Sequence, residues 1–585
     1  MAQVEMSDRG PDRDLASIQE ARALASRAKV ASREIVEFSQ ERIDRIVDEM
    51  AAAAQAEAEP LARLAVKETG YGVVADKIKK NLFAAEKVYE FIQPMKTVGV
   101  IRRLNDRRVV EIAEPFGVVA GLIPSTNPTS TAIYKILIAV KARCPIVLSP
   151  HPAASNSISR VAEIMTTAAR NAGAPDGTIG CMQTVTLEGT QELMRHRDVA
   201  VILATGGMGL VRAAYSAGKP AYGVGPGNAP AYIERSANLK KAVQDIVTGK
   251  TFDNGVLCSS ENSVVIDKEI SDAAKNEFVQ LGGYFLSPSE VDAVAKVLVT
   301  PQRLPSPGLV GKSALYVAEK AKIEVPPETR VLIAPLKGVG RDFPLSIEKL
   351  CPVLAFYIVR DWEEGCERCK QLLHYGGMGH TMAIHSQNEE VILEFGLKKP
   401  AFRIVVNTPT THGSIGLTTG LDPAMTLGCG GHGGNITSDN ISPRHLLNIK
   451  RLAYEVRPSK SESDSFAEQK LQSLSVTPTR PTEPGIEAET LVAKIDTFLL
   501  TRGYTANLSH DYPSPNADKI PPKAPALSQA PTTPPTTNDP VDFVCEDDVR
   551  QAIKEGRKIL LAERAVVTPA AKDLAGASDT IIKPN

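Results

Sequence analysis

One cysteine of the chain stands in a local sequence that suits covalent catalysis. Cys258 follows Asn254 and Gly255, a turn-forming pair, and precedes two small hydroxyl residues, Ser259 and Ser260. A thiol beside a turn can be solvent-accessible, and nearby backbone N–H groups can stabilise its thiolate. Because a lone cysteine is more often a buried structural residue, these neighbours alone leave both interpretations open.

Other stretches of the sequence combine apolar runs with polar or glycine-rich ends. Four of them are Glu114–Ser130, Ile138–Pro152, Ala204–Gly209 and Gly223–Pro230. Taken with the Cys258 stretch, they resemble the aldehyde dehydrogenase superfamily, and specifically its coenzyme-A-acylating branch. The strongest resemblance is to acylating acetaldehyde dehydrogenases, including the aldehyde dehydrogenase half of bifunctional aldehyde-alcohol dehydrogenases. It extends from about Leu15 to Val456.

The resemblance implies that Cys258 is the nucleophile of an aldehyde oxidation. A planar aldehyde is a poor hydride donor, so a thiolate first adds to it and forms a tetrahedral adduct. The oxyanion of that adduct needs hydrogen-bond donors, which in the superfamily are an asparagine side chain and the N–H of the cysteine. Asn127 occupies the position of that asparagine, although an asparagine before Pro128 is also an ordinary turn residue.

The resemblance also implies a site for a nicotinamide dinucleotide. The candidate residues are Ser149, Pro150, His151, Thr205, Gly206, Gly207, Gly225 and Glu348. The first three stand where hydrolytic relatives carry Lys-Pro near the adenine ribose, and the missing lysine leaves NAD versus NADP open. The threonine and its glycines match a loop where the backbone approaches the dinucleotide closely, but without the full G-x-G-x-x-G spacing. The glutamate matches the one that holds the nicotinamide ribose, or is an acid at a helix N-terminus.

The fate of the thioester decides the reaction. Acid-producing relatives activate water with the glutamate of a Glu-Leu-Gly-Gly-Lys motif, whereas this chain has Gly223-Val-Gly-Pro-Gly-Asn228 and no acid there. Water should therefore attack slowly, and we expect coenzyme A to be the acceptor because exchange between thiols is nearly isoenergetic. His380 resembles a histidine of the acylating branch and could deprotonate that thiol, or it is a hydrogen-bonded loop residue. An acid-producing enzyme with a displaced base is the alternative.

The aldehyde is weakly specified by the sequence. The branch implies short-chain aldehydes, acetaldehyde first. Polar candidates for the edge of the pocket are Thr410, Thr411, His412 and Arg403. They leave open an anionic aldehyde such as sulfoacetaldehyde or succinate semialdehyde, which Arg403 would clamp unless it faces solvent. Cys429 and His432 could line the substrate end, although glycine runs such as 428–434 are more often turns.

The elements that must position these residues indicate an α/β protein of the aldehyde-dehydrogenase type. Helical periodicity covers residues 11–95, and a strand-like pattern with a hairpin turn at Asn105-Asp106 follows. Apolar strands then alternate with amphipathic helices, which indicates two doubly wound parallel-sheet domains. The expected domains are 1–96 with 116–229 for the dinucleotide, 230–435 for catalysis, 97–115 with 436–457 as a small β oligomerisation arm, and 458–585 as a largely disordered tail. By resemblance, the arm implies a homo-oligomer, a dimer or a tetramer.

Composition limits the expected partners and location. The chain has 585 residues, 43% hydrophobic content and a formal net charge of −1, so we expect several domains and neither nucleic acid nor a membrane as partner. The apolar runs are interrupted by charge, and no signal peptide is recognised at the start. Eight scattered cysteines suit a reducing cytoplasm. Cys366-x-x-Cys369 has no second pair, which favours a structural role, and no metal site is expected.

The C-terminal region changes composition abruptly. Residues 458–540 are dominated by Pro, Ser, Thr, Ala and charge, which predicts a linker. Two amphipathic islands stand out, 486–504 and 547–575, and Thr568-Pro569 in the second is typical of a helix N-cap and first turn. Such islands resemble the encapsulation peptides of cargo enzymes in bacterial microcompartments, which would place the enzyme inside one, against shell or cargo proteins. The alternative is a small terminal subdomain that folds back on the body.

A non-enzymatic alternative is an assembly or cargo protein with an inactive body and a docking tail. The intact stretch around Cys258 argues against it, because nothing structural demands a cysteine there. We therefore predict a reversible oxidation of a short-chain aldehyde to acyl-coenzyme A with NAD, through a thiohemiacetal and a thioester on Cys258.

Overall fold

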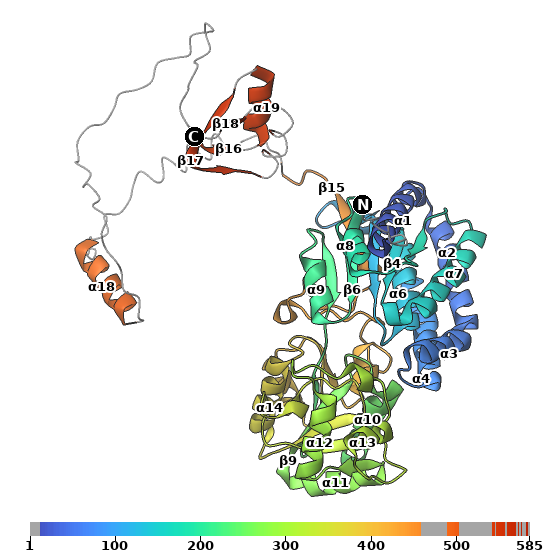
Figure 1. The fold of residues 1–585 in the computed structure, drawn as a ribbon, viewed down its shortest axis with the longest axis vertical. Coiled ribbons are helices and arrows are strands. Elements are labelled where there is room, and N and C mark those ends of the chain that lie inside the picture. Colours follow the sequence, from blue (N-terminus) through green and yellow to red (C-terminus); the bar gives the residue numbers. More distant parts are fainter. Residues whose placement is uncertain are drawn as a thin grey trace, which may run out of the picture. The chain divides into compact units, whose positions relative to one another are not determined.

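The computed structural model describes most of the first 457 residues and several short segments after them. The described residues are 12–457, 488–501, 541–544, 546–555, 558–568, 571, 575 and 581–582. The chain divides into two compact units, residues 1–465 and 466–585. The first unit contains sheets of five, seven and three strands (Figure 1). Among the described residues, no helix has the length and apolar character needed to cross a membrane.

Five α-helices open the chain, where the periodicity of residues 11–95 predicts helices. They are α1 (Arg13–Ile35), α2 (Gln40–Ala56), α3 (Ala58–Thr69), α4 (Val74–Leu82) and α5 (Val88–Ile92), with a π-helical turn, Phe83–Lys87, between the last two. Gly70, with a φ of 67°, ends α3 in the left-handed conformation that glycine adopts at little cost. This short stop turns the chain so that α4 begins four residues later.

The five-stranded sheet is parallel and has the order β5-β4-β3-β6-β7. Its strands are β3 (Val118–Ile123), β4 (Ile146–Pro150), β5 (Ile179–Cys181), β6 (Val199–Thr205) and β7 (Ala221–Val224). The connecting helices are α6 (Pro128–Lys141), α7 (Ser155–Asn171), α8 (Leu187–Arg195) and α9 (Met208–Tyr215). The strand order reverses between β3 and β6, and in open α/β sheets ligands bind beyond the carboxyl ends of strands at such a switch point.

Both faces of this sheet are buried. Alternate residues of β3 enter two separate clusters: Val119 packs with α2, α6 and α7, whereas Val118 and Ala120 pack with α1 and α8. Strands buried on both faces read as continuous apolar runs, which is why the run before Pro124 carries no alternation. The prediction of a doubly wound parallel sheet is confirmed.

The seven-stranded sheet is also parallel and has the order β10-β11-β12-β9-β8-β13-β14. Its strands are β8 (Ala229–Ile233), β9 (Glu261–Asp267), β10 (Gly283–Phe285), β11 (Val331–Pro335), β12 (Val353–Val359), β13 (Met382–His385) and β14 (Ile404–Val406). Its helices are α10 (Leu239–Thr251), α11 (Ser271–Gln280), α12 (Pro288–Leu298), α13 (Ala314–Ala321), α14 (Trp362–Tyr375), α15 (Glu389–Leu397) and α16 (Thr410–Ser414). Cys258 lies between α10 and the start of β9.

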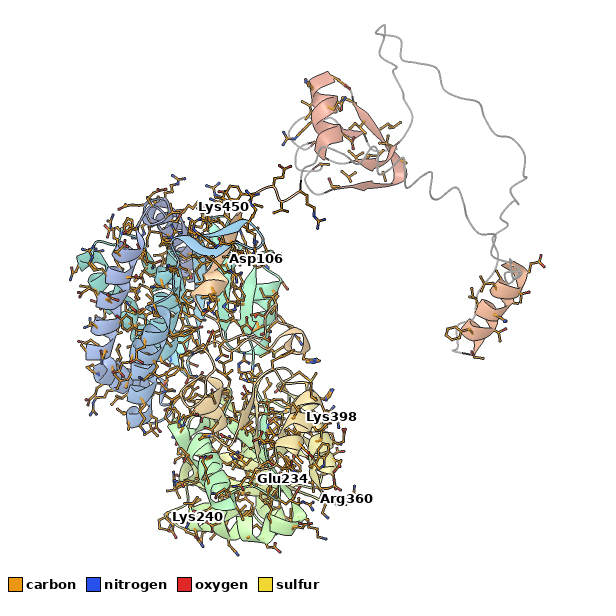
Figure 2. All side chains as sticks on the ribbon, turned by 180° about the vertical axis from the view of Figure 1, so that it is seen from behind. Asp106, Glu234, Lys240, Arg360, Lys398 and Lys450 are labelled. Carbon is orange, nitrogen blue, oxygen red and sulfur yellow. The ribbon has the colours of Figure 1, made fainter. Side chains whose placement is uncertain are left out.

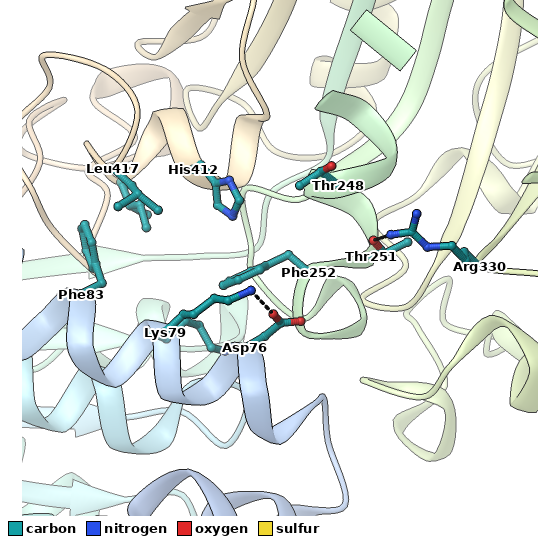
Figure 3. A pocket seen from close by; sticks show the side chains of 11 residues that line it. Asp76, Lys79, Phe83, Thr248, Thr251, Phe252, Arg330, His412 and Leu417 are labelled. Carbon is teal, nitrogen blue, oxygen red and sulfur yellow. Dashed lines mark hydrogen bonds and ion pairs between the residues drawn. The ribbon is translucent and has the colours of Figure 1, made fainter. Parts of the chain in front are cut away.

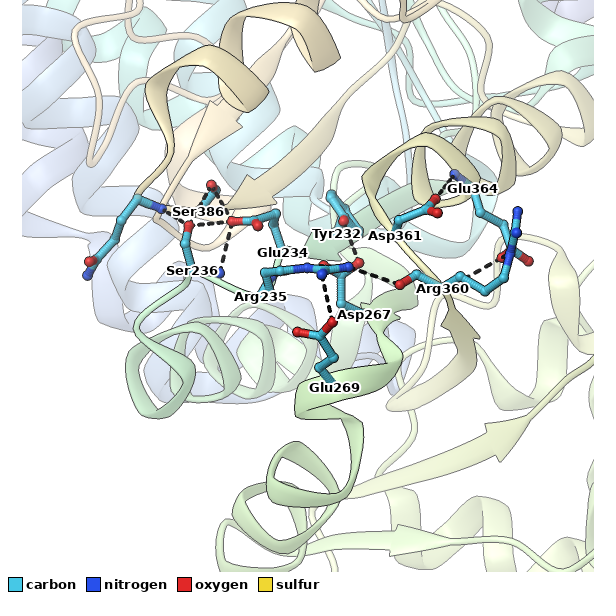
Figure 4. A network of polar contacts seen from close by, with 11 residues as sticks. Tyr232, Glu234, Arg235, Ser236, Asp267, Glu269, Arg360, Asp361, Glu364 and Ser386 are labelled. Carbon is cyan, nitrogen blue, oxygen red and sulfur yellow. Dashed lines mark hydrogen bonds and ion pairs between the residues drawn. The ribbon is translucent and has the colours of Figure 1, made fainter.

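A buried carboxylate joins the far ends of three strands of this sheet (Figure 4). Asp267 accepts hydrogen bonds from the Tyr232 hydroxyl at 2.6 Å and from the backbone N–H and Nε of Arg235 at 3.1 and 3.0 Å. The same arginine donates to the carbonyl oxygen of Arg360 at 3.0 Å. Because Asp267 ends β9 and Cys258 precedes its first residue, this network stabilises the end of the strand opposite the cysteine.

The three-stranded sheet is antiparallel and has the order β1-β2-β15. Its strands are β1 (Gly99–Leu104), β2 (Val109–Pro115) and β15 (Leu447–Ala453). The hairpin turn lies where Asn105-Asp106 predicts it, and Lys450 pairs across the sheet with Glu114 at 2.9 Å; Asp106 and Lys450 are labelled in Figure 2. The last predicted strand, within 446–456, is therefore present, while its use in oligomerisation stays a prediction.

The described residues of the second unit include the helices α18 and α19 and a small parallel sheet. Its elements are α18 (Ala488–Leu500), β16 (Val541–Val544), α19 (Glu546–Glu555), β17 (Ile559–Val567) and β18 (Ile581–Ile582). The sheet order is β16-β17-β18, and its core includes Val544, Val549, Ile559 and Leu561. The described part of the predicted island 547–575 contains most of α19, then β17, and Ala571 and Ala575 are again helical. The Ala571 N–H donates to Thr568 Oγ1 at 3.3 Å, as the predicted N-cap requires. Val549, Ile559 and Leu561 are buried, whereas Ile553 is 42% exposed. Most of the predicted linker, 458–487 and 502–540, lies outside the described residues.

The Cys366-x-x-Cys369 pair lies inside α14 and packs in the core with Tyr232 and Phe395. Lys399 Nζ donates a hydrogen bond to Cys366 Sγ at 2.5 Å. Over the described part of the chain, no group of three or more His, Cys, Asp or Glu side chains is arranged to hold a metal ion.

Candidate active site

A cleft of about 740 Å³, which we name the central cleft, lies where the first two sheets meet. Its walls include the loops that follow β3, β4, β6 and β7. Ten of the eleven predicted site residues line it: Asn127, Ser149, Pro150, His151, Thr205, Gly206, Gly207, Gly225, Cys258 and Glu348. Residues that are more than 200 positions apart in sequence are thus gathered in one space.

The backbone before Cys258 has an unusual left-handed course. Asp253, Asn254 and Gly255 have φ angles of 49°, 53° and 72°, and for non-glycine residues this region is costly unless the surroundings enforce it. The Asn254 side chain donates to the carbonyl oxygen of Gly311 at 2.9 Å. The Asp253 carboxylate accepts from the backbone N–H of Val73 at 2.7 Å. These contacts hold the turn that presents the cysteine.

The thiol of Cys258 is partly exposed and lines the central cleft. Desolvation by the surrounding protein raises its pKa to about 12, and the nearby carboxyl group of Glu348 contributes in the same direction. At neutral pH the group is therefore mainly a thiol, so a proton acceptor must assist its ionisation.

The amide of Asn127 has a defined orientation. The residue precedes α6, whose first position is Pro128, and its Oδ1 accepts a hydrogen bond from Lys80 Nζ at 2.6 Å. Because an ammonium group has only donors, the atom that faces Lys80 must be the oxygen. Nδ2, which donates to Thr126 Oγ1 at 3.2 Å, retains a second N–H.

The predicted dinucleotide residues lie along the cleft. Ser149 is buried and its hydroxyl contacts Thr190 Oγ1 at 2.8 Å, whereas His151 is exposed. Gly207 is the N-cap residue of α9. At Gly225 a Cβ atom would lie 2.8 Å from Met208 Sδ, so a side chain there would press on the start of the same helix.

Glu348 lies in an irregular loop and not at a helix N-terminus, which removes that alternative interpretation. Its Oε1 accepts a hydrogen bond from the Gly227 backbone N–H at 3.0 Å. Burial raises the pKa of this carboxyl group to about 8. At neutral pH the group is therefore largely protonated.

His380 is the predicted residue that the central cleft does not include. It is buried, with Nδ1 2.9 Å from Thr381 Oγ1, and Nε2 has no hydrogen-bond partner among the described residues. A Cβ atom placed on Gly227 would lie 3.2 Å from His380 Cγ and 2.1 Å from the carbonyl oxygen of Cys258. The histidine is therefore separated from the cysteine backbone by one glycine. Burial and the nearby Arg403 lower its pKa to about 3.

Arg403 does not face solvent, so that interpretation of the residue is wrong. It is buried, and its guanidinium donates to Asn440 Oδ1 and to the carbonyl oxygens of His380, Gly428, Ser438 and Asp439 at 2.6–3.2 Å. Desolvation is tolerated because these bonds satisfy the charged group. Arg403 thus fixes the glycine-rich loop.

The other substrate-end candidates are dispersed. Cys429 is buried with Sγ 3.5 Å from the Leu427 carbonyl oxygen, whereas His432 is exposed and stacks on Phe402 with ring centroids 5.3 Å apart. Thr410 and Thr411 are buried. None of these four lines the central cleft.

A second cavity of about 270 Å³, which we name the side cavity, contains His412 in its wall (Figure 3). α4 contributes Asp76, Lys79 and Lys80, and the segment before the cysteine contributes Phe252. Asp76 and Lys79 are paired at 3.2 Å. The Lys80–Asn127 hydrogen bond therefore connects the walls of the two cavities.

Sequence reasoning missed the cluster that supports both site loops. Lys77, Lys80 and Asp253 are buried, and both ammonium groups donate to the one carboxylate. In the sequence the two lysines resemble the solvent face of an amphipathic helix. The available signal was the Asp-Asn-Gly run, because Asp and Asn tolerate left-handed backbone and Asp253 then needs a cation if it is buried.

Two doubly wound sheets with a partly exposed cysteine and an oriented amide in the cleft between them define a class of α/β proteins suited to covalent chemistry on a carbonyl group. Residues 11–282 match the aldehyde dehydrogenase family. The chain is 42% identical over 442 residues to the bifunctional aldehyde-alcohol dehydrogenase AdhE of Escherichia coli, a match that covers 75% of this chain and 50% of that protein. It thus spans about half the length of this curated relative.

Solved structures extend the comparison. An acetylating aldehyde dehydrogenase from Geobacillus thermoglucosidasius is 52% identical, with a TM-score of 0.76, and the match covers 77% of this chain and all of that one. A propionaldehyde dehydrogenase from the Clostridium phytofermentans fucose utilisation bacterial microcompartment is 27% identical, with a TM-score of 0.68, over 76% of this chain and 99% of that one. The chain belongs to the aldehyde dehydrogenase family.

Proposed function

We propose that the chain is a coenzyme-A-acylating aldehyde dehydrogenase that converts a short-chain aldehyde, acetaldehyde first, with NAD and coenzyme A to acyl-coenzyme A and NADH. The observation that carries the proposal is the composition of the central cleft. Cys258 and Asn127 share it, and Glu348 is the only carboxylate among the described residues that line it. The similarity to an acetylating aldehyde dehydrogenase supports the same reaction.

The walls of the cleft fit a nicotinamide dinucleotide. Gly207 begins α9 without a Cβ, which leaves backbone N–H groups accessible to a phosphate. Leu187, Met208 and Leu304 line the cleft with 63%, 44% and 61% of their surface exposed, and exposed apolar side chains at a cleft suit an adenine ring. NAD bound here would accept the hydride, and the choice of NAD over NADP is part of the proposal.

The chain's own residues would carry out the carbon chemistry. Cys258 Sγ attacks the aldehyde carbon, and the new oxyanion accepts hydrogen bonds from Asn127 Nδ2 and from the Cys258 N–H. When hydride leaves this adduct, the carbon–oxygen double bond forms again and a thioester remains on Sγ. The sulfur of coenzyme A then attacks the thioester and releases Cys258.

The properties of Glu348 favour a thiol over water as the acceptor. A carboxyl group with a pKa of about 8 is largely protonated at neutral pH and therefore a poor base for water. It also already accepts a hydrogen bond from Gly227. The acyl-enzyme would then persist until coenzyme A arrives. This argument disfavours the acid-producing alternative.

His380 is the candidate base for the thiol of coenzyme A. Its imidazole is neutral at neutral pH, and Nε2 has no hydrogen-bond partner in the part of the chain that the structure describes, so this nitrogen can accept a proton. Burial makes it a weak base. His380 can therefore serve as this base only if bound coenzyme A changes the environment of the imidazole beside Gly227.

The test of this function is the coenzyme A requirement. Without coenzyme A, we expect a single turnover of NADH formation from acetaldehyde. The rate after that turnover should be at least tenfold lower than with coenzyme A, because no other acyl acceptor is activated in the cleft. Absorbance at the NADH band and product analysis by mass spectrometry measure this. Steady acetate formation without coenzyme A would assign the chain to the acid-producing enzymes instead.

We also propose that the protein is a cytoplasmic homo-oligomer, with contacts through the β1-β2-β15 sheet, and that the tail addresses it to a bacterial microcompartment. The support for the tail is α18, which exposes Leu491, Val492 and Ile495 at 49%, 56% and 48%, together with the microcompartment origin of one structural relative. An amphipathic helix with an exposed apolar face suits a groove on another protein. The segment around α19 is a weaker candidate because Val549 and Ala552 are buried and, of the large apolar residues described in this helix, only Ile553 is exposed.

Deletion of residues 458–585 tests the tail. We expect the truncated chain to fold and to retain activity within about twofold, because the two units are separate compact bodies. Sedimentation with purified shell proteins should be lost with the deletion and also after Leu491→Glu with Ile495→Glu. Loss of folding on truncation would instead indicate a subdomain that the body requires.

A further inference from the structure

Helix α4 connects the two loops on which the proposed chemistry depends. Asp76, Lys77 and Lys80 are spaced to lie on one side of the helix. Asp76 accepts a hydrogen bond from the Asp253 backbone N–H at 2.9 Å, and Lys77 Nζ donates to the Thr126 carbonyl oxygen at 3.1 Å. The helix therefore bridges the loop before α6 and the turn before Cys258.

Lys80 is the residue of this helix that contacts the proposed oxyanion donor. Its Nζ donates to Asn127 Oδ1 at 2.6 Å and to the Asp253 carboxylate, and the side chain is 2% exposed. Asp253 keeps the buried ammonium charged, and Lys80, with a pKa that burial lowers to about 8, is still mainly protonated at neutral pH.

The contact has two consequences for Asn127. First, it prevents the amide from flipping, because the reversed amide would direct its NH₂ group at an ammonium group. Second, a cation on the carbonyl oxygen polarises the amide and strengthens its N–H as a donor. Both effects act on the Nδ2 hydrogen that would meet the oxyanion.

We propose that Lys80 is a positioning residue that holds the Asn127 carboxamide with its N–H toward the oxyanion of the Cys258 adduct. This inference rests on the proposed function, since it concerns the same site. Lys80 itself does not touch the aldehyde. It acts through its hydrogen bond to Asn127, and its ion pair with Asp253 fixes the position of that amide relative to the turn before Cys258.

Lys77 provides the matched control. Both lysines are buried and both donate to Asp253 Oδ2, so replacing either with methionine removes one cation from the same carboxylate. Only Lys80 contacts Asn127. A merely structural role predicts similar effects of the two replacements, whereas the positioning role predicts a difference.

The experiment measures the first turnover of NADH formation from acetaldehyde by stopped flow, before coenzyme A is needed. We expect Lys80→Met to slow this step by ~10²-fold, the effect of losing one oxyanion donor, and Lys77→Met by less than ~10-fold. In an Asn127→Ala background, Lys80→Met should add less than ~3-fold, since residues that act as one unit are not additive. The Kd for NAD should stay within ~3-fold.

Two results would overturn the inference: equal slowing by the two lysine variants, or full additivity of Lys80→Met with Asn127→Ala. If Lys80→Met does not fold, Lys80→Ala is assayed with propylammonium, which the side cavity beside Lys80 can admit. We expect at least a tenfold recovery with Asn127 present and none in the Asn127→Ala background. A folded Lys80→Ala protein without recovery contradicts the role. Failure of the proposed function is distinguishable, because the wild type would then form either no NADH or NADH and acetate steadily without coenzyme A.

Discussion

Replacement of Cys258 by alanine is expected to reduce aldehyde-dependent NADH formation by at least ~10⁴-fold, because the hydride donor in the proposed reaction exists only as an adduct on this sulfur. The cleft around it should stay intact, since the side chain removed is small and partly exposed. Steady-state kinetics with acetaldehyde, NAD and coenzyme A measures the loss. The Kd for NADH, measured by the fluorescence of the bound dinucleotide, should be within about threefold of wild type.

Cys429→Ala is the matched control for this variant. Cys429 is buried outside the lining of the central cleft, so its loss should change the rate by less than about tenfold through packing alone. A Cys258→Ala protein that keeps more than a tenth of wild-type activity would show that the nucleophile is another group. In wild type, a mass increase on the peptide that contains Cys258 after incubation with aldehyde and NAD would identify the acyl-enzyme directly.

Gly227→Ala should be the most damaging replacement of a residue that takes no part in the chemistry. The added Cβ would lie 2.1 Å from the carbonyl oxygen of Cys258 and 3.2 Å from the His380 ring, and backbone atoms cannot rotate away. We expect the nucleophile to shift and the rate to fall by roughly 10²-fold. Overpacking should also destabilise the fold by about 1–3 kcal/mol, which differential scanning calorimetry would detect.

Gly396→Ala is the control for this replacement. Gly396 lies in α15, where nothing is within 4 Å of the added Cβ, so alanine should be neutral or slightly stabilising through its helix propensity. Wild-type activity in Gly227→Ala would mean that the backbone around Cys258 can move without consequence, and the geometric account of the site would then be wrong.

The fold could be predicted from the sequence largely because its strands are buried on both faces. Residues 118–123 and 146–148 are uninterrupted apolar runs, and a helix separates them. The antiparallel hairpin was marked by its turn. The secondary structure after residue 540 was harder to predict from the sequence. The helix α19 and the strand β17 follow one another there, in a segment that the sequence analysis treated as one amphipathic island.

The candidate site was predicted as far as local motifs and resemblance allow. They identified ten of the residues that line the central cleft, most of which lie at the end of a strand or in a turn or loop that follows one. They could not show that Gly227 separates His380 from the Cys258 backbone, or that backbone carbonyl oxygens accept hydrogen bonds from Arg403. Both facts depend on contacts between distant loops. The buried Lys77–Lys80–Asp253 cluster was missed for the same reason: periodicity assigns helical lysines to solvent.

The left-handed turn before the cysteine also affects the rate at which Asn254 deamidates. Asn-Gly pairs are the sequences most prone to deamidation, in which the glycine nitrogen attacks the asparagine side chain and inserts an isoaspartate into the backbone. Here the Asn254 side chain is held by its hydrogen bond to Gly311, so the native fold restrains the reaction at the place where a backbone insertion would displace the nucleophile. Chemical lifetime at this turn should therefore follow the rate at which the loop opens.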